Sequence, residues 1–162
     1  MANYNNTAFT IMDDWMTPKH AWEDIKEFIP IDKVIWEPFY GNGKSGQDIR
    51  DLGYDVIHEK IDFFENDLGE IIVSNPPFDK KILSKILKRL KKIDKPFILI
   101  MPSGKLNTNY FKECFKNEIQ LIMPKPNRIA FTKMSKEKYT TPSFICYYYC
   151  YKMNLPRDII WL

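Results

Sequence analysis

The feature that most constrains the fold of this chain is a short apolar run that ends in two prolines, Ile71-Ile72-Val73-Ser74-Asn75-Pro76-Pro77-Phe78. Its β-branched residues favour a buried strand. Neither a strand nor a helix continues through paired prolines, because proline lacks a backbone N–H group and fixes φ. The run therefore predicts a rigid turn at the carboxyl end of a central strand, which is where ligands bind in open α/β sheets.

The residues of this turn carry groups that can recognise a planar ligand with an NH2 group. The side-chain amide of Asn75 and the carbonyl of Pro76 are two acceptors, and Phe78 offers a flat face for stacking. We expect them to bind an exocyclic amine, such as that of a nucleobase. The alternative is a proline turn that follows a core strand and has no catalytic role.

The tetrapeptide Asn75-Pro76-Pro77-Phe78 resembles the (Asn/Asp)-Pro-Pro-(Tyr/Phe) motif of S-adenosylmethionine-dependent amino-methyltransferases, above all those that act on N6 of adenine. The resemblance implies that these four residues form the catalytic site and that S-adenosylmethionine is the cofactor. It also implies a Rossmann-like class I methyltransferase fold. That is an α/β fold with a mostly parallel sheet and a C-terminal antiparallel strand.

Length and composition fit one globular domain spanning residues 1–162, with 44% hydrophobic and 28% charged residues. No apolar run approaches the roughly 20 residues of a membrane span, and the N-terminus lacks a signal-peptide pattern. We therefore expect a cytoplasmic protein, or one in the host cytosol or nucleus if the source is viral, without a membrane partner. Residues 1–13 are polar and predict a flexible arm.

Cysteine and histidine usage argues against a metal site. The three cysteines, Cys114, Cys146 and Cys150, form no CxxC pair. They are interpreted as reduced thiols, two of them on one face of a late strand. The two histidines, His20 and His58, have no partner at ligand spacing, so no bound metal is expected.

Thr17 and Pro18 predict the start of a helix, with Thr17 as the N-cap and Pro18 at the first helical position. Apolar residues follow at helical spacing: Ala21, Trp22, Ile25, Phe28 and Ile29. A helix cap is the simpler interpretation of the pair. Adenine methyltransferases, however, carry a similar Thr-Pro before the first strand, where it closes over the methionine end of the cofactor. The resemblance therefore assigns both residues to the cofactor site.

The segment 34–37 is a predicted first strand, and it leads into a turn in which Gly41 and Gly43 allow positive φ and close backbone approach to a ligand. One interpretation is a phosphate-binding loop ending in Gly43-Lys44-Ser45. That motif needs a glycine where Pro38 stands, and no later strand ends in a suitable Mg²⁺-binding aspartate.

The other interpretation rests on resemblance to the first methyltransferase motif, an acidic residue followed by a Gly-x-Gly turn. It implies that Glu37 meets the positive charge of the methionine moiety. The remaining residues that it places in the cofactor site are Pro38, Phe39, Gly41 and Gly43.

Two acidic residues follow a helix predicted at about 46–52 and a second strand at 54–58. Glu59, at the end of that strand, is in the position that binds ribose hydroxyls in Rossmann-like folds. The resemblance implies that Asp62 accepts a hydrogen bond from the amine of the cofactor's adenine and that Phe63 packs against that ring. Larger relatives place a helix and a third strand between the two acids, so strand three is predicted to be reduced here.

An amphipathic helix is predicted after Phe78, with many cations and no acid before Asp94. The cations are Lys80, Lys81, Lys85, Lys88, Arg89, Lys91 and Lys92. Such a run is commonly a solvated face. Here the helix starts beside the predicted site, and we expect Lys80, Lys81, Lys85 and Lys88 to contact nucleic-acid phosphates.

The C-terminal half predicts strands at 96–101, 119–123 and 143–151, and a helix at 109–117. The basic segment 127–131 in the last long loop resembles a loop of phage N6-adenine DNA methyltransferases, where an arginine and an aromatic residue lie near the target base. Arg128 and Phe131 are therefore predicted to bind nucleic acid. The alternative is an ordinary surface loop.

The resulting hypothesis is methyl transfer from S-adenosylmethionine to N6 of adenine in nucleic acid, with DNA favoured over RNA. Alternatives are methylation of guanine N2 in ribosomal RNA, methylation of a protein glutamine, and a catalytically silent subunit that helps a partner to bind nucleic acid. The chain has no room for a separate target-recognition domain. We therefore expect loose specificity, a single-stranded or RNA substrate, or a homodimer or partner subunit that supplies target recognition.

Overall fold

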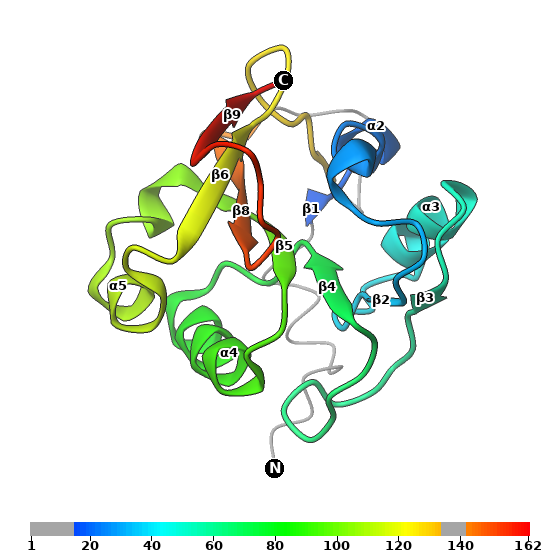
Figure 1. Cartoon of the computed structure of the whole chain (residues 1–162), viewed down its shortest axis with the longest axis horizontal. Helices are drawn as coiled ribbons and strands as arrows, with labels where there is room; N and C mark the ends of the chain where they lie inside the picture. The colour runs from blue at the N-terminus through cyan, green and yellow to red at the C-terminus, as the bar shows by residue number, and fades with distance from the viewer. Residues whose placement is uncertain (1–14, 134–141) are drawn as a thin grey trace.

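A computed structural model of the chain describes residues 15–133 and 142–162 (Figure 1). The predicted arm of residues 1–13 lies outside the described residues. In chain order, the elements are β1 (Trp15–Met16), α2 (Lys19–Glu23), η1 (Lys26–Phe28), β2 (Ile35–Trp36), α3 (Lys44–Asp51), β3 (Val56–Ile57), β4 (Ile71–Ser74), α4 (Lys80–Ile93), β5 (Phe97–Pro102), η2 (Ser103–Lys105), α5 (Asn109–Phe115), β6 (Ile119–Met123), β7 (Thr132–Lys133), β8 (Cys146–Tyr151) and β9 (Ile159–Trp161).

A mixed sheet of seven strands forms the centre of the molecule, in the order β3-β2-β4-β5-β8-β6-β9. The strand pairs are parallel except where β8 meets β5 and β6, to which it runs antiparallel. Helices α2 and α3 cover one face of the sheet, and α4 and α5 cover the other (Figure 1). The prediction of an α/β fold with a mostly parallel sheet is therefore confirmed.

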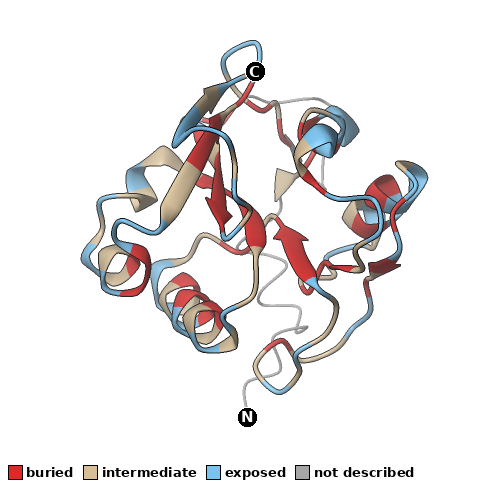
Figure 2. Cartoon of the chain, viewed as in Figure 1, coloured by how far each residue is buried: buried red, intermediate tan, exposed pale blue. Residues whose placement is uncertain are grey.

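The layers follow from the alternation of side chains along the strands. In β5, Ile98 and Ile100 face the cluster under α2 and α3, whereas Phe97, Leu99 and Met101 face the cluster under α4 and α5. Because helices cover both faces of the sheet, the central strands bury side chains on both faces (Figure 2). This explains why these strands are continuous apolar runs in the sequence.

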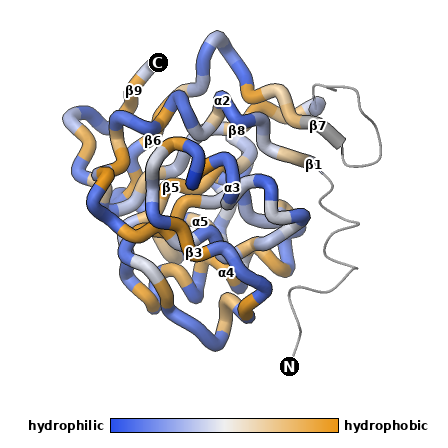
Figure 3. The backbone as a smooth tube through the Cα atoms, turned by 90° about the vertical axis from the view of Figure 1, so that its right-hand side faces the viewer, coloured by the Kyte–Doolittle hydropathy of each residue, from blue (hydrophilic) through white to orange (hydrophobic). Residues whose placement is uncertain are grey.

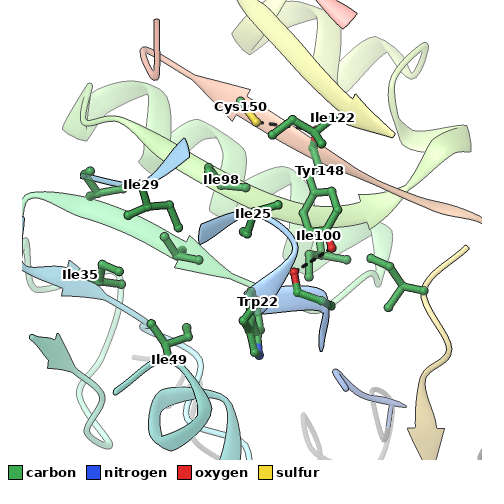
Figure 4. Packing of buried hydrophobic residues seen from close by; sticks show 14 of the residues in the cluster. Trp22, Ile25, Ile29, Ile35, Ile49, Ile98, Ile100, Ile122, Tyr148 and Cys150 are labelled. Carbon is green, nitrogen blue, oxygen red and sulfur yellow. Dashed lines mark hydrogen bonds between the residues drawn. The ribbon is translucent and has the colours of Figure 1, made fainter. Parts of the chain in front are cut away.

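The first predicted helix is shorter than expected. Helix α2 ends at Glu23 and a 3-10 turn follows, although Ile25 and Ile29 still face the core. The prediction that Thr17 is the N-cap was wrong: Pro18 holds that position and makes no side-chain capping hydrogen bond. The helix is anchored instead by Tyr148, whose hydroxyl donates to the Ala21 carbonyl across 2.8 Å (Figure 4).

A second, two-stranded antiparallel sheet lies beside the main one, where β1 pairs with β7 (Figure 3). Met16 is opposite Thr132 in this pairing. This pairing joins the residues just before Thr17 to the end of the basic segment 127–131, which comes more than one hundred residues later in the chain.

The connection between β3 and β4 carries no helix or strand in residues 58–70, all of which are described. The late elements follow the predicted order, with β8 starting at Cys146 instead of residue 143. Cys146 and Cys150 are buried on one face of β8 as predicted. The short edge strand β9 was not predicted; it pairs in parallel with β6.

None of the helices within the described ranges combines the length and the apolar character that crossing a membrane requires.

Candidate active site at the carboxyl ends of β2, β3 and β4

Three parallel strands end at one edge of the sheet, and the predicted site residues follow them. Glu37 comes directly after β2, Glu59 lies just beyond β3, and Asn75 follows β4. Because β2 pairs in parallel with both β3 and β4, these carboxyl ends are neighbours. The sheet thus brings together residues that lie up to 38 positions apart in the sequence.

Glu37 is buried at this edge of the sheet, since only 1% of its surface is exposed to solvent. Its Oε1 atom accepts hydrogen bonds from Ser74 Oγ at 2.5 Å and from the Phe39 backbone N–H at 3.0 Å. Burial raises the pKa of Glu37 to about 8, and hydrogen bonds from Ser74, Phe39, Ser45 and the Asn75 backbone oppose that rise. In this structure Glu37 joins the glycine turn to the diproline turn, and its predicted contact with the methionine moiety stays a prediction.

The raised pKa predicts a specific pH dependence of stability. Folded Glu37 holds its proton up to about pH 8, whereas the ordinary pKa of a glutamate side chain is 4.5. The wild type should therefore lose stability as the pH rises from about 5 through 8, on the order of 4 kcal/mol relative to Glu37→Gln, which does not titrate. Urea unfolding of both proteins at several pH values measures this difference, and parallel pH curves would contradict it.

The side chain of Asn75 is held by a hydrogen bond from its amide nitrogen. Nδ2 donates to Thr17 Oγ1 across 3.0 Å, whereas Oδ1 is buried and has no hydrogen-bond partner among residues 15–133 and 142–162. An unsatisfied buried acceptor costs about 1–3 kcal/mol and is uncommon in native structures. The Asn75 oxygen is therefore one of six buried polar side-chain atoms in the described part of the chain that are left without a partner, and it is the one that belongs to the diproline turn.

Aromatic side chains gather next to Asn75. Phe144 lies edge-on to Phe78, with ring centroids 5.7 Å apart, and edge-on to Trp15 at 6.1 Å. Pro76 and Pro77 are buried, whereas Phe78 is half-buried. The sequence analysis missed Phe144 and Trp15; the only signal was that each lies two residues from a proline or threonine of a motif already noted.

The two predicted residues of the basic loop lie against other parts of the protein. Phe131 is fully buried in the core, 6.4 Å from the Phe144 ring, so it cannot stack on a base as placed. Arg128 is half-buried and donates to the Pro142 carbonyl across 3.2 Å. Both residues contact neighbours within the protein, and their predicted binding of nucleic acid stays a prediction.

The turn after β2 has the predicted glycine conformations, because Gly41 and Gly43 both have positive φ. A Cβ atom built on Gly41 would meet nothing within 4 Å, so space is open beside this part of the turn. Lys44 forms an ion pair with Asp48 of its own helix. Its ammonium group is therefore engaged, as would not be expected of a lysine that binds phosphate.

The two acids after β3 remain accessible, but the aromatic residue beside them does not. Glu59 is exposed, and half-buried Asp62 uses Oδ1 to accept the Phe64 N–H at 2.8 Å. Phe63 is only 1% exposed and packs against Trp36 and Phe39. The Phe63 ring is thus covered by aromatic neighbours in this structure, and its predicted contact with an adenine stays a prediction.

His58 is a structural member of the same edge that sequence reasoning did not place there. Its Nδ1 atom lies 2.8 Å from the Glu37 carbonyl, and its ring stacks on Tyr40 with centroids 4.8 Å apart. The ring also lies directly against Gly46 at the start of α3. His58 thereby fixes the end of β2 relative to the glycine turn.

Helix α4 starts immediately after the diproline turn, where the Asp79 side chain caps it by accepting from the Lys81 and Ile82 N–H groups. The four lysines predicted to bind phosphate are all exposed: Lys80, Lys81, Lys85 and Lys88. Arg89 instead donates to the Asn66 carbonyl, and Lys91 pairs with Glu118 at 2.6 Å. Lys81, Lys85 and Lys88 follow helical spacing and form one line that leads away from Phe78.

Within the described part of the chain, no three His, Cys, Asp or Glu side chains are grouped so that they could hold a metal ion. No protein-family model matches the chain, and no curated protein matches it significantly. Functional inference therefore depends on the residues themselves.

Proposed function

We propose that this protein transfers a methyl group from S-adenosylmethionine to the exocyclic N6 amine of adenine in nucleic acid. The observation that carries the proposal is the Oδ1 atom of Asn75, a buried acceptor without a partner at the carboxyl end of β4. Asn75 belongs to the Asn-Pro-Pro-Phe sequence, which resembles the motif of adenine methyltransferases. It lies at the same edge of the sheet as the glycine turn with positive φ.

The residues at this edge fit the proposed cofactor in part. The open space at Gly41 allows the backbone of the turn to approach a ligand, and the accessible carboxylates of Glu59 and Asp62 can accept hydrogen bonds from ribose hydroxyls or an adenine amine. When bound, S-adenosylmethionine supplies an electrophilic methyl group. Buried Glu37 and Phe63 would support this site from behind.

The chain's own contribution to the reaction is to orient the target amine. An adenine amine is a weak nucleophile because its lone pair is delocalised into the ring. Hydrogen bonds from its two N–H groups to Asn75 Oδ1 and the Pro76 carbonyl would draw the nitrogen toward tetrahedral geometry and free the lone pair on the opposite side. Orientation of this kind supplies on the order of 7–11 kcal/mol. The nitrogen would gain the methyl group as the bond between that group and the sulfur breaks, and the methylated amine would then release one proton to water.

Shielding of Asn75 Oδ1 from solvent means that neighbouring groups must move aside before a base reaches it. A bound amine would satisfy an acceptor that otherwise has no partner, and this gain offsets part of that movement. Stacking on Phe78 would add about 1–3 kcal/mol. A base in a duplex must also be flipped out, which costs a few kcal/mol and favours single-stranded or loosely paired substrates.

A transfer assay tests the proposal directly. The protein is incubated with S-adenosylmethionine labelled in its methyl group and with separate pools of DNA, RNA and protein, and the products are digested for mass spectrometry. Labelled N6-methyladenine in DNA or RNA supports the proposal. Label on guanine N2 or on protein glutamine, or no transfer by a chain that still binds nucleic acid, contradicts it.

The lysines of α4 predict the salt dependence of nucleic-acid binding. In Lys81→Gln/Lys85→Gln, each lost phosphate contact should reduce the slope of log K against log salt by about 0.7–0.9. The matched control is Lys26→Gln/Lys33→Gln, which removes the same charge between α2 and β2. Fluorescence anisotropy at several salt concentrations measures both slopes; equal slopes for the two variants would assign the α4 lysines to a solvated surface.

A further inference from the structure

Asn75 is held in place by a residue 58 positions earlier in the chain. The only hydrogen bond found for its side chain in the described structure runs from Nδ2 to Thr17 Oγ1, at 3.0 Å. The terminal torsion of asparagine is broad and roughly two-fold, so packing alone fixes the amide plane weakly. The hydrogen bond to the Thr17 hydroxyl therefore restrains the plane of the Asn75 amide.

Thr17 is well suited to that task because its own position is fixed from both sides. Thr17 is 5% exposed. Met16 before it pairs with Thr132 of β7, and the carbonyl of Pro18 after it accepts the Ala21 N–H at 3.0 Å. The backbone on either side is thus tied to the second sheet and to the first turn of α2.

The Asn75 backbone is fixed independently of its side chain. Ser74 donates from Oγ to Glu37, and the Asn75 N–H also forms a hydrogen bond with the Glu37 carboxyl group. Glu37 therefore fixes where the residue lies, and Thr17 fixes how its amide is turned. Loss of the Thr17 hydroxyl would leave the main chain of the diproline turn in place and release only the amide.

We propose that Thr17 is a positioning residue for Asn75: its hydroxyl accepts from Nδ2 and so holds Oδ1 toward the substrate amine. The inference builds on the proposed methyl transfer. It differs from the role that the resemblance implied, contact with the methionine end of the cofactor, because the hydroxyl is already engaged by the asparagine. Thr17 acts on the rate through Asn75 and has no direct contact with the reacting atoms.

The kinetic test compares Thr17→Val, which keeps the shape and loses the hydroxyl, with Thr17→Ser, which keeps the hydroxyl. Thr17→Val should lower kcat about 10–100-fold, with the KM for nucleic acid and the Kd for cofactor within about threefold of wild type. Thr17→Ser should stay within about threefold in kcat. Equal loss in both variants, or a loss confined to cofactor affinity in Thr17→Val, would overturn the proposal.

A second readout does not depend on methyl transfer. The side-chain NH2 signals of Asn75 in a ¹⁵N-labelled protein can be assigned by their absence from Asn75→Asp. Their hydrogen exchange should accelerate at least about tenfold in Thr17→Val and stay near the wild-type rate in Thr17→Ser. If wild type transfers no methyl group but shows this exchange pattern, the proposed function fails and the positioning role stands. Unchanged exchange in Thr17→Val rejects the positioning role.

Discussion

Asn75→Ala is expected to reduce the rate of methyl transfer by at least about 10²–10³-fold, the typical effect of removing one preorganised polar contact to a reacting group. The substitution deletes Oδ1, the unsatisfied acceptor, and leaves the Pro76 carbonyl as the remaining oxygen of the pair. Affinity for the cofactor should change by less than about threefold, because the glycine turn and the acids after β3 are untouched. Single-turnover kinetics and calorimetry measure the two effects separately.

Asn75→Asp is the matched variant for this prediction. A carboxylate keeps an acceptor where Oδ1 lies, and the Thr17 hydroxyl can turn to donate to the second oxygen. Asn75→Asp should therefore transfer methyl groups at least about tenfold faster than Asn75→Ala. Transfer by Asn75→Ala at a rate close to wild type, or a parallel loss of cofactor binding, would show that the asparagine does not orient the amine.

Gly46→Ala is expected to cause the largest loss of stability among single substitutions at this edge. A Cβ atom on Gly46 would lie 2.2 Å from His58 Cδ2, 2.3 Å from Cγ and 2.5 Å from Cβ, all far inside contact distance. His58 cannot move away cheaply, because it is 3% exposed, bound to the Glu37 carbonyl and stacked on Tyr40. A cost of roughly 3–5 kcal/mol follows, equivalent to a fall in Tm of about 6–20 °C.

Gly104→Ala is the control, because a Cβ atom there would meet nothing within 4 Å. Its Tm should stay close to that of the wild type, since alanine restricts the unfolded chain without creating a clash. Thermal unfolding followed by circular dichroism compares the two variants. Similar melting temperatures for Gly46→Ala and Gly104→Ala would mean that the His58 ring is not locked under α3.

The fold class could be predicted from the sequence because its signals are local. The apolar run that ends at Asn75-Pro76-Pro77 determines a strand and its end within eight residues, and the turn at Gly41 and Gly43 is equally self-contained. The exposed lysine face of α4 follows from helical periodicity in the same way. By contrast, β9 has three residues and no such pattern.

The direction in which a side chain points could not be predicted, because it depends on residues distant in the sequence. Glu37 is turned inward by Ser74, 37 positions later, and Phe131 is buried by packing against Phe144 across the segment 132–141. Phe63 is held by Trp36 of β2 and by Phe39 of the turn after β2. A motif gives the residue type at each of these positions, but the sheet and its neighbours decide whether that residue meets a ligand or the core.

The central claim is that Asn75 and Pro76 accept the amine of an adenine base. The most direct measurement is a crystal structure of the protein with S-adenosylhomocysteine and a short single-stranded oligonucleotide that contains adenine. The account predicts the adenine N6 atom at hydrogen-bond distance, about 3 Å, from both Asn75 Oδ1 and the Pro76 carbonyl, with Phe78 against the base. An adenine bound elsewhere, or an Asn75 oxygen paired within the protein while the base is bound, would contradict it.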